Sequence, residues 1–371
     1  MFHLDSPPSI VPGIGGPIVA EPAPVPTPVE ILCKGAQSGV GAGYPGVIGL
    51  IRKGSNTDYV EVGCKKFQTT APVERTSKFR IGGNTKAFTA VVMLQLEAEG
   101  KLSLDDTLDK HLPGAVSANG NDGIKFTLRH LLNQTSGLPD YAATQDFATT
   151  YELNLDPTHT WTPKQLVDLA TTQPPVGAPG EKFHYANTNY VLAGMVIEKV
   201  TGNTVAAEIT TRIITPLGLT GTTFPTTDPQ LSGNFLDGHS ITWGIYRQVT
   251  ASQVTSHGAA GALVSSLDDL AKFERALIRG DLLPARQQQA LKTTVPIKDR
   301  VGYGLGILRV DTASGPVWQH TGTTLGYFTF FLTSEDGEKQ IIMAANEFHP
   351  HLPTPAQNTL GQAAMDAYNA L

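Results

Sequence analysis

The chain has 371 residues, enough for one large or two modest domains, and 40% of them are hydrophobic, which allows a sizeable core. A formal net charge of −6 with no basic run argues against a nucleic-acid partner, and no apolar stretch is long enough to span a bilayer. Cys33 and Cys64 are the only cysteines, so there is no disulfide framework, and the pair is either bridged or free.

Residues 1–30 are rich in proline, which favours an extended backbone and predicts that this segment forms no helix. We interpret it as a disordered leader or linker, or as a segment that docks on the body of the protein. No basic start precedes an apolar run, so we expect no signal peptide in this sequence. This predicts a cytoplasmic protein, and a secreted protein whose signal was removed is the alternative.

Strand and helix patterns follow one another along the rest of the chain. The β-rich runs 47–52 and 59–62 flank a predicted hairpin turn at 53–56. A helix is predicted after two glycines, Gly82 and Gly83, and it ends at Glu99. Further helices are predicted at 128–133, 162–172, 188–201, 267–279 and 355–370, and further strands at 304–310, 317–319, 327–332 and 340–345.

This order of elements predicts an α+β fold, because strands lie near both ends of the chain and helices lie between them. One sheet domain would be assembled from residues 31–110 and 255–371. A mainly helical domain, residues 111–254, would be inserted between them, and the proline-rich segment 1–30 would precede both. Sites for small molecules commonly lie in clefts between such domains.

The stretch FRIGGNTKAFTA at 79–90 contains the first candidate for a catalytic residue. Lys86 falls near the start of a predicted helix, where a cation opposes the helix dipole and therefore does not stabilise the helix. A residue placed against its local electrostatics is a functional candidate. The alternative is a surface lysine in the first turn.

Two further stretches contain residue types that suit acyl-transfer chemistry. The run FHYANTNY at 183–190 contains Tyr185 and Asn187, and the run WQHTGTTLGY at 318–327 contains His320. Each has a structural alternative: an aromatic anchor for Tyr185, an N-cap of the following helix for Asn187, and a structural strand histidine for His320. The ten histidines show no metal-ligand spacing, with His349-Pro350-His351 a weak exception, so we expect no metal and no cofactor.

These three stretches resemble, in order, the S-x-x-K, Y-x-N and H-T-G or K-T-G motifs of the β-lactamase and penicillin-binding-protein superfamily of serine hydrolases. The run LLNQTSGL at 131–138 is also similar to that family, and the resemblance covers roughly residues 40 to 370. It is nearest to actinobacterial D-Ala-D-Ala carboxypeptidases. The resemblance implies a β-lactamase-like fold: an antiparallel sheet flanked by helices, an inserted all-helical domain, and an active site in the cleft between them.

The resemblance also implies roles for the first two motifs. The serine nucleophile of the family would fall at position 83, which is Gly83 in this chain. Lys86 would be the base that takes the proton from the nucleophile, provided that it is partly neutral. Tyr185 would shuttle the proton between nucleophile, lysine and leaving group. Asn187 would hold Lys86 and a substrate carbonyl.

The third motif would complete the site on the opposite wall. His320 would donate a hydrogen bond to the Tyr185 oxygen or attract a substrate carboxylate. Thr321, Gly322 and Thr323 would bind the substrate, with Gly322 permitting close approach of its backbone. The backbone N–H groups of Thr323 and of position 83 would form the oxyanion hole.

Gly83 leaves three interpretations open. We favour a serine replaced by glycine in an otherwise intact enzyme, next a natural pseudoenzyme that binds ligands without turnover, and last an enzyme with another nucleophile. The expected function is a serine-type acyl-enzyme hydrolase or acyltransferase, an esterase or transacylase, acting on small esters or amides with water or an amine as acceptor. A D-Ala-D-Ala carboxypeptidase is the alternative.

Overall fold

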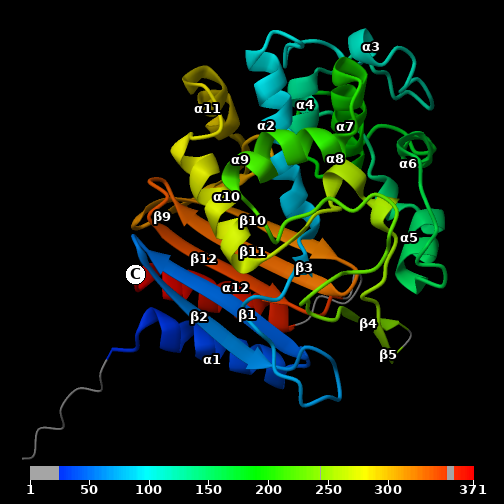
Figure 1. Cartoon of the computed structure of the whole chain (residues 1–371). Helices are drawn as coiled ribbons and strands as arrows, with labels where there is room; N and C mark the ends of the chain where they lie inside the picture. Colours follow the sequence, from blue (N-terminus) through cyan, green and yellow to red (C-terminus); the bar gives the residue numbers. More distant parts are fainter. Residues whose placement is uncertain (1–24, 243, 349–354) are drawn as a thin grey trace, which may run out of the picture.

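The computed structural model describes residues 25–242, 244–348 and 355–371, and its centre is an eight-stranded antiparallel sheet (Figure 1). Most of the predicted leader therefore lies outside the described residues. The order of the strands across the sheet is β2-β1-β12-β11-β10-β9-β8-β7. Their bounds are β1 Gly46–Lys53, β2 Asn56–Gly63, β7 Val295–Lys298, β8 Val301–Tyr303, β9 Leu308–Thr312, β10 Gly315–Thr324, β11 Tyr327–Ser334 and β12 Lys339–Ala345.

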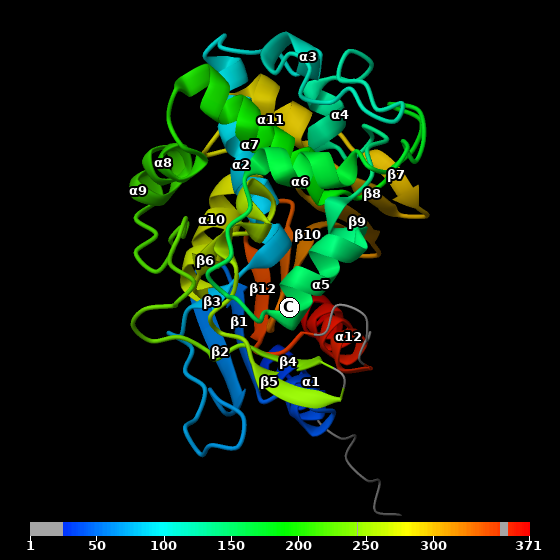
Figure 2. The same ribbon diagram turned by 90° about the vertical axis from the view of Figure 1, so that its right-hand side faces the viewer.

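Strand β1 shows why the sheet is covered on both faces. Alternate side chains of a strand point to opposite faces, so Ile48 and Leu50 join the core on one side while Val47 and Ile51 join the core on the other. The first side packs against α2 (Thr85–Ala98) and α10 (Leu267–Arg279), and the second against α1 (Pro28–Gly41) and α12 (Pro355–Asn369) (Figures 1 and 2). The sheet is thus the middle of three layers.

The start of α1 corrects one prediction, because Pro28 lies in the segment for which no helix was expected. Proline is tolerated in the first helical turn, where its missing N–H would have no partner. Thr27 caps this helix, since its Oγ1 accepts from the Glu30 amide and the Glu30 carboxylate accepts from the Thr27 amide. Local capping therefore starts the helix despite the proline-rich surroundings.

The predicted hairpin and the predicted long helices are confirmed. β1 and β2 pair through a turn at Gly54, whose φ is +61°, and α10 spans the predicted residues. The strand predicted at 304–310 is wrong in its first half, because β9 begins only at Leu308. Gly306, with φ +81°, instead turns the chain against α2: a Cβ there would lie 2.8 Å from the Lys86 carbonyl oxygen.

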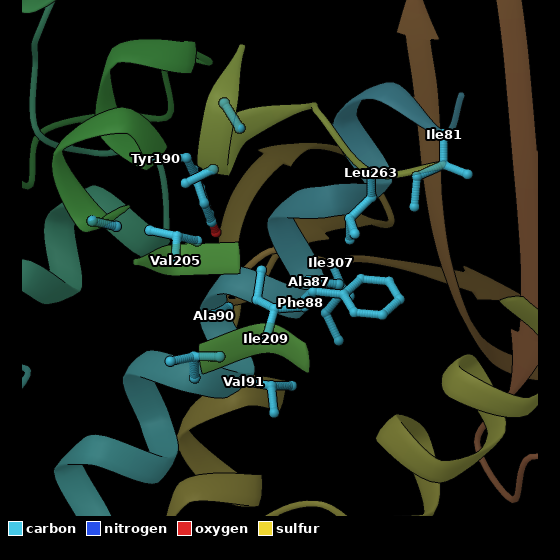
Figure 3. Close-up of a cluster of buried hydrophobic side chains, with 14 of the residues drawn as sticks. Ile81, Ala87, Phe88, Ala90, Val91, Tyr190, Val205, Ile209, Leu263 and Ile307 are labelled. Atoms are coloured by element: carbon cyan, nitrogen blue, oxygen red, sulfur yellow. The ribbon is translucent and has the colours of Figure 1, made fainter. Parts of the chain in front are cut away.

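Helix α2 is buried along most of its length, which agrees with its mostly apolar sequence. Ten consecutive residues from Thr85 to Leu94 are buried. Figure 3 shows Ala87, Phe88 and Val91 packed among side chains from other parts of the chain, including Ile209 and Leu263. The first turn of α2 therefore lies inside the protein rather than on its surface.

Residues 111–254 contain most of the remaining helices, but their last part returns to the sheet region. A short hairpin, β4 (His239–Thr242) with β5 (Ile245–Gln248), follows the helices. Backbone hydrogen bonds join Leu236 to Lys78 and His239 to Asn346. The helices of this segment are α4 Leu128–Leu132, α5 Gln145–Leu153, α6 Pro163–Ala170, α7 Asn187–Thr201, α8 Val205–Ile209 and α9 Thr215–Leu217.

The division into segments 1–30, 31–110 with 255–371, and 111–254 stays a prediction.

Cys33 and Cys64 are both free thiols. Throughout the described ranges, no helix combines the length and apolar character needed to cross a bilayer.

Candidate active site

The candidate site begins where β3 (Phe79–Arg80) passes through a 3₁₀ turn, Gly82–Asn84, into α2. Glycine is required twice here, because this turn lies directly against β10. Gly82 has φ +49°, and a Cβ on it would lie 2.5 Å from the Thr323 carbonyl oxygen. A Cβ on Gly322 would lie only 1.9 Å from the Ile81 carbonyl oxygen. Gly322 therefore permits close packing of the protein's own backbone, where the sequence analysis expected the approach of a substrate.

Lys86 is fully buried, so the alternative of a surface lysine is wrong. Its Nζ donates to Asn187 Oδ1 at 2.7 Å and to the Ala260 carbonyl oxygen at 2.9 Å, and it lies 4.7 Å from the centre of the Tyr185 ring. Burial lowers the pKa of Lys86 from 10.5 to about 7, while the carboxylate of Asp140 opposes that shift. A sizeable fraction of this amine is therefore neutral near pH 7.

Gly83 faces the residues that sequence analysis assigned to catalysis. A Cβ at this position would lie 3.0 Å from Tyr185 Oη, 3.1 Å from His320 Cε1 and 3.2 Å from the Thr321 carbonyl oxygen. Its φ lies outside the left-handed region, so a serine fits the backbone and requires its neighbours to move by only a few tenths of an ångström. The Tyr185 side chain is 37% exposed, yet desolvation raises the pKa of Tyr185, so its hydroxyl keeps its proton.

Asn187 is oriented by Asp140, a residue that sequence analysis missed. The Asn187 amide N–H and side-chain Nδ2 donate to the two Asp140 carboxylate oxygens at 3.0 and 3.1 Å, which turns Oδ1 toward Lys86. Asn187 is the first residue of α7 and makes no N-cap bond, so the capping alternative is wrong. Asp140 follows the family-like run 131–138 and caps the turn Tyr141–Ala143. In the sequence, an aspartate at this place indicates a cap and gives no sign of a role in the site.

His320 is buried and has partners other than those expected. Its Nδ1 donates to the Thr321 carbonyl oxygen at 2.8 Å, and its Nε2 lies 3.4 Å from the Tyr303 hydroxyl. Burial, together with the positive charge of Lys86, lowers the pKa of His320 to about 3. A neutral imidazole with these contacts neither attracts a substrate carboxylate by charge nor donates to Tyr185, as the sequence analysis had expected; it packs beside position 83.

A cavity of about 300 Å³ opens beside these groups, and Gly83 and Thr323 both line it. Thr321 and Thr323 are exposed on β10. A larger cavity of about 820 Å³ adjoins the first and shares with it Asp140, Ala143 and Tyr185. Of the motif residues, Gly83, Tyr185, Asn187 and Thr323 therefore line one cavity, and Tyr185 also lines its neighbour.

The ionisable groups around the smaller cavity are mainly acidic, and burial raises the pKa of Asp140 while Lys86 and the hydrogen bonds from Ala142 and Asn187 oppose that shift. Among the described residues that line this cavity, Asp140 and Glu152 are acidic, and His257 is the basic one. Burial lowers the pKa of His257 to about 3, so that ring is neutral. No cluster of three or more His, Cys, Asp or Glu in the described ranges is arranged to hold a metal, and His349 and His351 fall outside those ranges.

Comparisons with known proteins agree with this architecture. Of the solved structures, a D-stereospecific amidohydrolase from Streptomyces sp. is 34% identical, covers 91% of this chain and 98% of its own, and superposes with a TM-score of 0.81. D-amino acid amidase from Ochrobactrum anthropi shares the fold at 24% identity, with a TM-score of 0.79 and coverages of 92% and 97%.

Relatives in sequence point to the same group. Penicillin-binding protein 4* of Bacillus subtilis is 28% identical over 292 residues, which are 74% of this chain and 62% of that protein. Protein flp of Staphylococcus aureus is 36% identical over 154 residues, 41% of this chain and 29% of flp. The chain thus spans less than two thirds of either relative. The β-lactamase family profile matches residues 36–365, so this chain, with its antiparallel sheet and flanking helices, belongs to the β-lactamase family of serine hydrolases.

Proposed function

We propose that this site carries out serine-type acyl transfer on small amides or esters, and that Gly83 makes the chain a nucleophile-deficient form that binds such substrates and turns them over very slowly. The observation that carries the proposal is the state of Lys86. Its amine is fully buried between two fixed carbonyl acceptors, and it lies 4.7 Å from the centre of the Tyr185 ring, whose hydroxyl would face a side chain at position 83. Such an environment produces an amine that can act as a base at neutral pH.

The N–H bonds and the lone pair of the Lys86 amine indicate how it would act. A neutral amine has two N–H bonds and one lone pair, and Asn187 Oδ1 and the Ala260 carbonyl occupy two donor positions. The lone pair would take the proton from a hydroxyl at position 83 as the oxygen attacks the substrate carbonyl. The backbone N–H groups of Gly83 and Thr323 would stabilise the oxyanion.

Collapse of the tetrahedral intermediate then requires a proton on the leaving group. Tyr185, whose hydroxyl would lie beside the nucleophile, would pass the proton from Lys86 to the departing nitrogen or oxygen as the carbonyl–leaving-group bond breaks. Water or an amine would attack the resulting acyl-enzyme by the reverse route. Water gives hydrolysis, and an amine gives acyl transfer.

The charges of the cavity refine the substrate. We infer an acyl donor with a free amine, because the described lining of the cavity contains the acidic residues Asp140 and Glu152 and no lysine or arginine. A D-Ala-D-Ala carboxypeptidase substrate ends instead in a carboxylate, for which the described lining offers no lysine or arginine as a partner. The 34% identical Streptomyces neighbour is a D-stereospecific amidohydrolase, which supports D-amino acid amides and esters as the first substrates to try.

The test restores the missing group. The Gly83→Ser variant should hydrolyse p-nitrophenyl esters and D-amino acid amides and should form one acyl adduct on the peptide that contains position 83, detected by mass spectrometry. Loss of the nucleophile costs on the order of 10⁶ in turnover in a serine hydrolase. Gly83→Ala is the matched control, because it adds the Cβ and no hydroxyl.

A second variant tests the base. Adding Lys86→Ala to Gly83→Ser should abolish the gain, because the hydroxyl would lose its proton acceptor. If the serine variant forms no adduct and hydrolyses no ester, amide, D-peptide or β-lactam, the proposed enzymatic activity is refuted. The chain would then be a binding module for ligands of this family.

A further inference from the structure

We call the cavity of about 300 Å³ beside Gly83 the catalytic cavity. A separate cavity, here named the second cavity and distinct from the one of about 820 Å³, lies behind one wall of the catalytic cavity and takes no part in the mechanism above. Its volume is about 260 Å³. Its lining is mainly apolar and comes from α6, α7, α8 and the segments around residues 224 and 254–259. The principal lining side chains are Trp161, Leu166, Met195, Val205, Phe224 and Ala259.

The wall between the two cavities is one short segment, residues 254–260, which we call the partition. Gly258 and Ala259 line the second cavity, whereas His257 and Ala260 line the catalytic cavity. The carbonyl oxygen of Ala260 accepts from Lys86 Nζ at 2.9 Å. A molecule in the second cavity would therefore contact residues adjacent to the peptide group that holds the catalytic amine.

Trp161 connects the second cavity to the same partition. Its backbone N–H donates to Thr255 Oγ1 of the partition at 2.8 Å, and its indole Nε1 donates at 3.0 Å to Oε1 of Gln253, the residue just before the partition. On the catalytic side, the Tyr141 hydroxyl donates to the Ser256 carbonyl oxygen at 2.8 Å. An aromatic ligand packed on the indole would thus act on a segment that is hydrogen-bonded from both sides.

The charge of the cavity restricts its ligand. Glu198 is the charged residue among the described lining residues; it is exposed, and its Oε1 accepts from the Val205 amide at 3.2 Å. A carboxylate at an apolar cavity disfavours anions and tolerates neutral or cationic molecules. The two aromatic rings, Trp161 and Phe224, favour a ligand with a ring of its own.

We propose that this cavity binds a small aromatic molecule without negative charge, and that its occupancy is transmitted to the catalytic cavity through the partition. Binding itself does not depend on the function proposed above. The transmission requires only that the ligand change the packing or the mobility of residues 254–260.

The binding experiment uses the full chain with Gly83 and three probes of similar size: 2-phenylethanol, 2-phenylethylamine and phenylacetate. Titration calorimetry should show saturable binding of the alcohol and the amine, and binding at least tenfold weaker for phenylacetate. Ala206 lines the cavity, and Ala207 beside it is exposed, so Ala206→Phe should abolish binding and Ala207→Phe should leave it unchanged. No saturable binding, or binding that survives Ala206→Phe, would overturn the site.

The transmission is measured by hydrogen exchange on the peptide that spans residues 254–262, with and without saturating 2-phenylethanol. Exchange should slow at least threefold in the chain and in Ala207→Phe, and should not respond in Ala206→Phe. The affinity for an uncleaved D-amino acid amide should change at least threefold under the same conditions. Saturable binding with unaltered exchange would overturn the transmission. The calorimetry and the exchange use no substrate, so both stay decisive if Gly83→Ser fails to hydrolyse any substrate, whereas the amide affinity rests on the proposed function.

Discussion

Replacing Lys86 by methionine tests whether the fold holds this amine close to neutrality. Methionine has a similar length and no charge, so it fills the same space between α2 and α7. The native lysine is fully buried, and burial lowers its pKa from 10.5 to about 7. Between these two values the unfolded chain binds a proton that the folded chain has lost, so the stability of the native protein should increase with pH across that window.

The size of the effect follows from the same two values. Their difference, 10.5 minus about 7, corresponds to about 5 kcal/mol over the whole window, and about 4 kcal/mol of it falls between pH 6 and pH 10. Methionine also leaves Asn187 Oδ1 and the Ala260 carbonyl without this donor, at a cost of about 1–3 kcal/mol each. The pH dependence therefore reports the charge of Lys86 together with its effect on Asp140, whose pKa burial raises and the charge of Lys86 lowers.

Urea denaturation from pH 6 to pH 10 measures the difference in unfolding free energy between the native chain and Lys86→Met. The difference should move by about 4 kcal/mol in favour of the native chain as the pH rises. Lys272→Met is the control, because Lys272 is an exposed lysine on α10 and its removal should leave the curve nearly parallel. A change smaller than 1 kcal/mol for Lys86→Met would show that the buried amine is not neutralised by the fold, and would remove the basis for assigning it as the catalytic base.

Three further predictions use the same structure. In the Gly83→Ser background, Asp140→Asn keeps the size of the side chain and removes its charge. Hydrolysis should fall at least tenfold, and the acid limb of the pH–rate profile should move to lower pH because Lys86 loses the charge that raises its pKa. An unmoved limb would contradict this effect of Asp140 on Lys86. Glu274 is fully buried with both carboxylate oxygens unpartnered, and burial raises its pKa well above 4.5. Glu274→Leu should therefore raise the unfolding free energy by about 1–3 kcal/mol at pH 7 and by less at pH 4.5. No gain at pH 7 would point to a partner for the carboxylate. Gly322→Ala should destabilise the protein by more than about 3 kcal/mol in urea denaturation, because the added Cβ meets the backbone of Ile81. Gly361→Ala is the control: its added Cβ has open space around it, so the change should be nearly neutral or stabilising. Equal effects of the two changes would contradict the close packing of β10.

The sequence by itself determined the elements whose signals are local. Three signals depend on neighbours within a few residues: the β-rich composition of 47–52, the turn residues around Gly54, and the helical pattern of 267–279. The corresponding strand, turn and helix are present. Motif order along the chain also indicated the family that the profile of 36–365 establishes. The first half of the strand predicted at 304–310 was wrong, because Gly306 turns where the chain packs closely against the backbone of α2. No local sequence pattern indicates that contact.

Only the tertiary structure decided the state of the site. Lys86 stands in a first helical turn that sequence patterns place at the surface as readily as inside, and its two acceptors lie 101 and 174 residues further along the chain. Asp140 could not be recognised because it acts through the fold: it orients Asn187, 47 residues away, and its charge affects the Lys86 pKa across space. Burial and hydrogen bonding set a pKa through the groups that surround the amine in space, and this chain assembles those groups only when α2, α7 and the partition pack together.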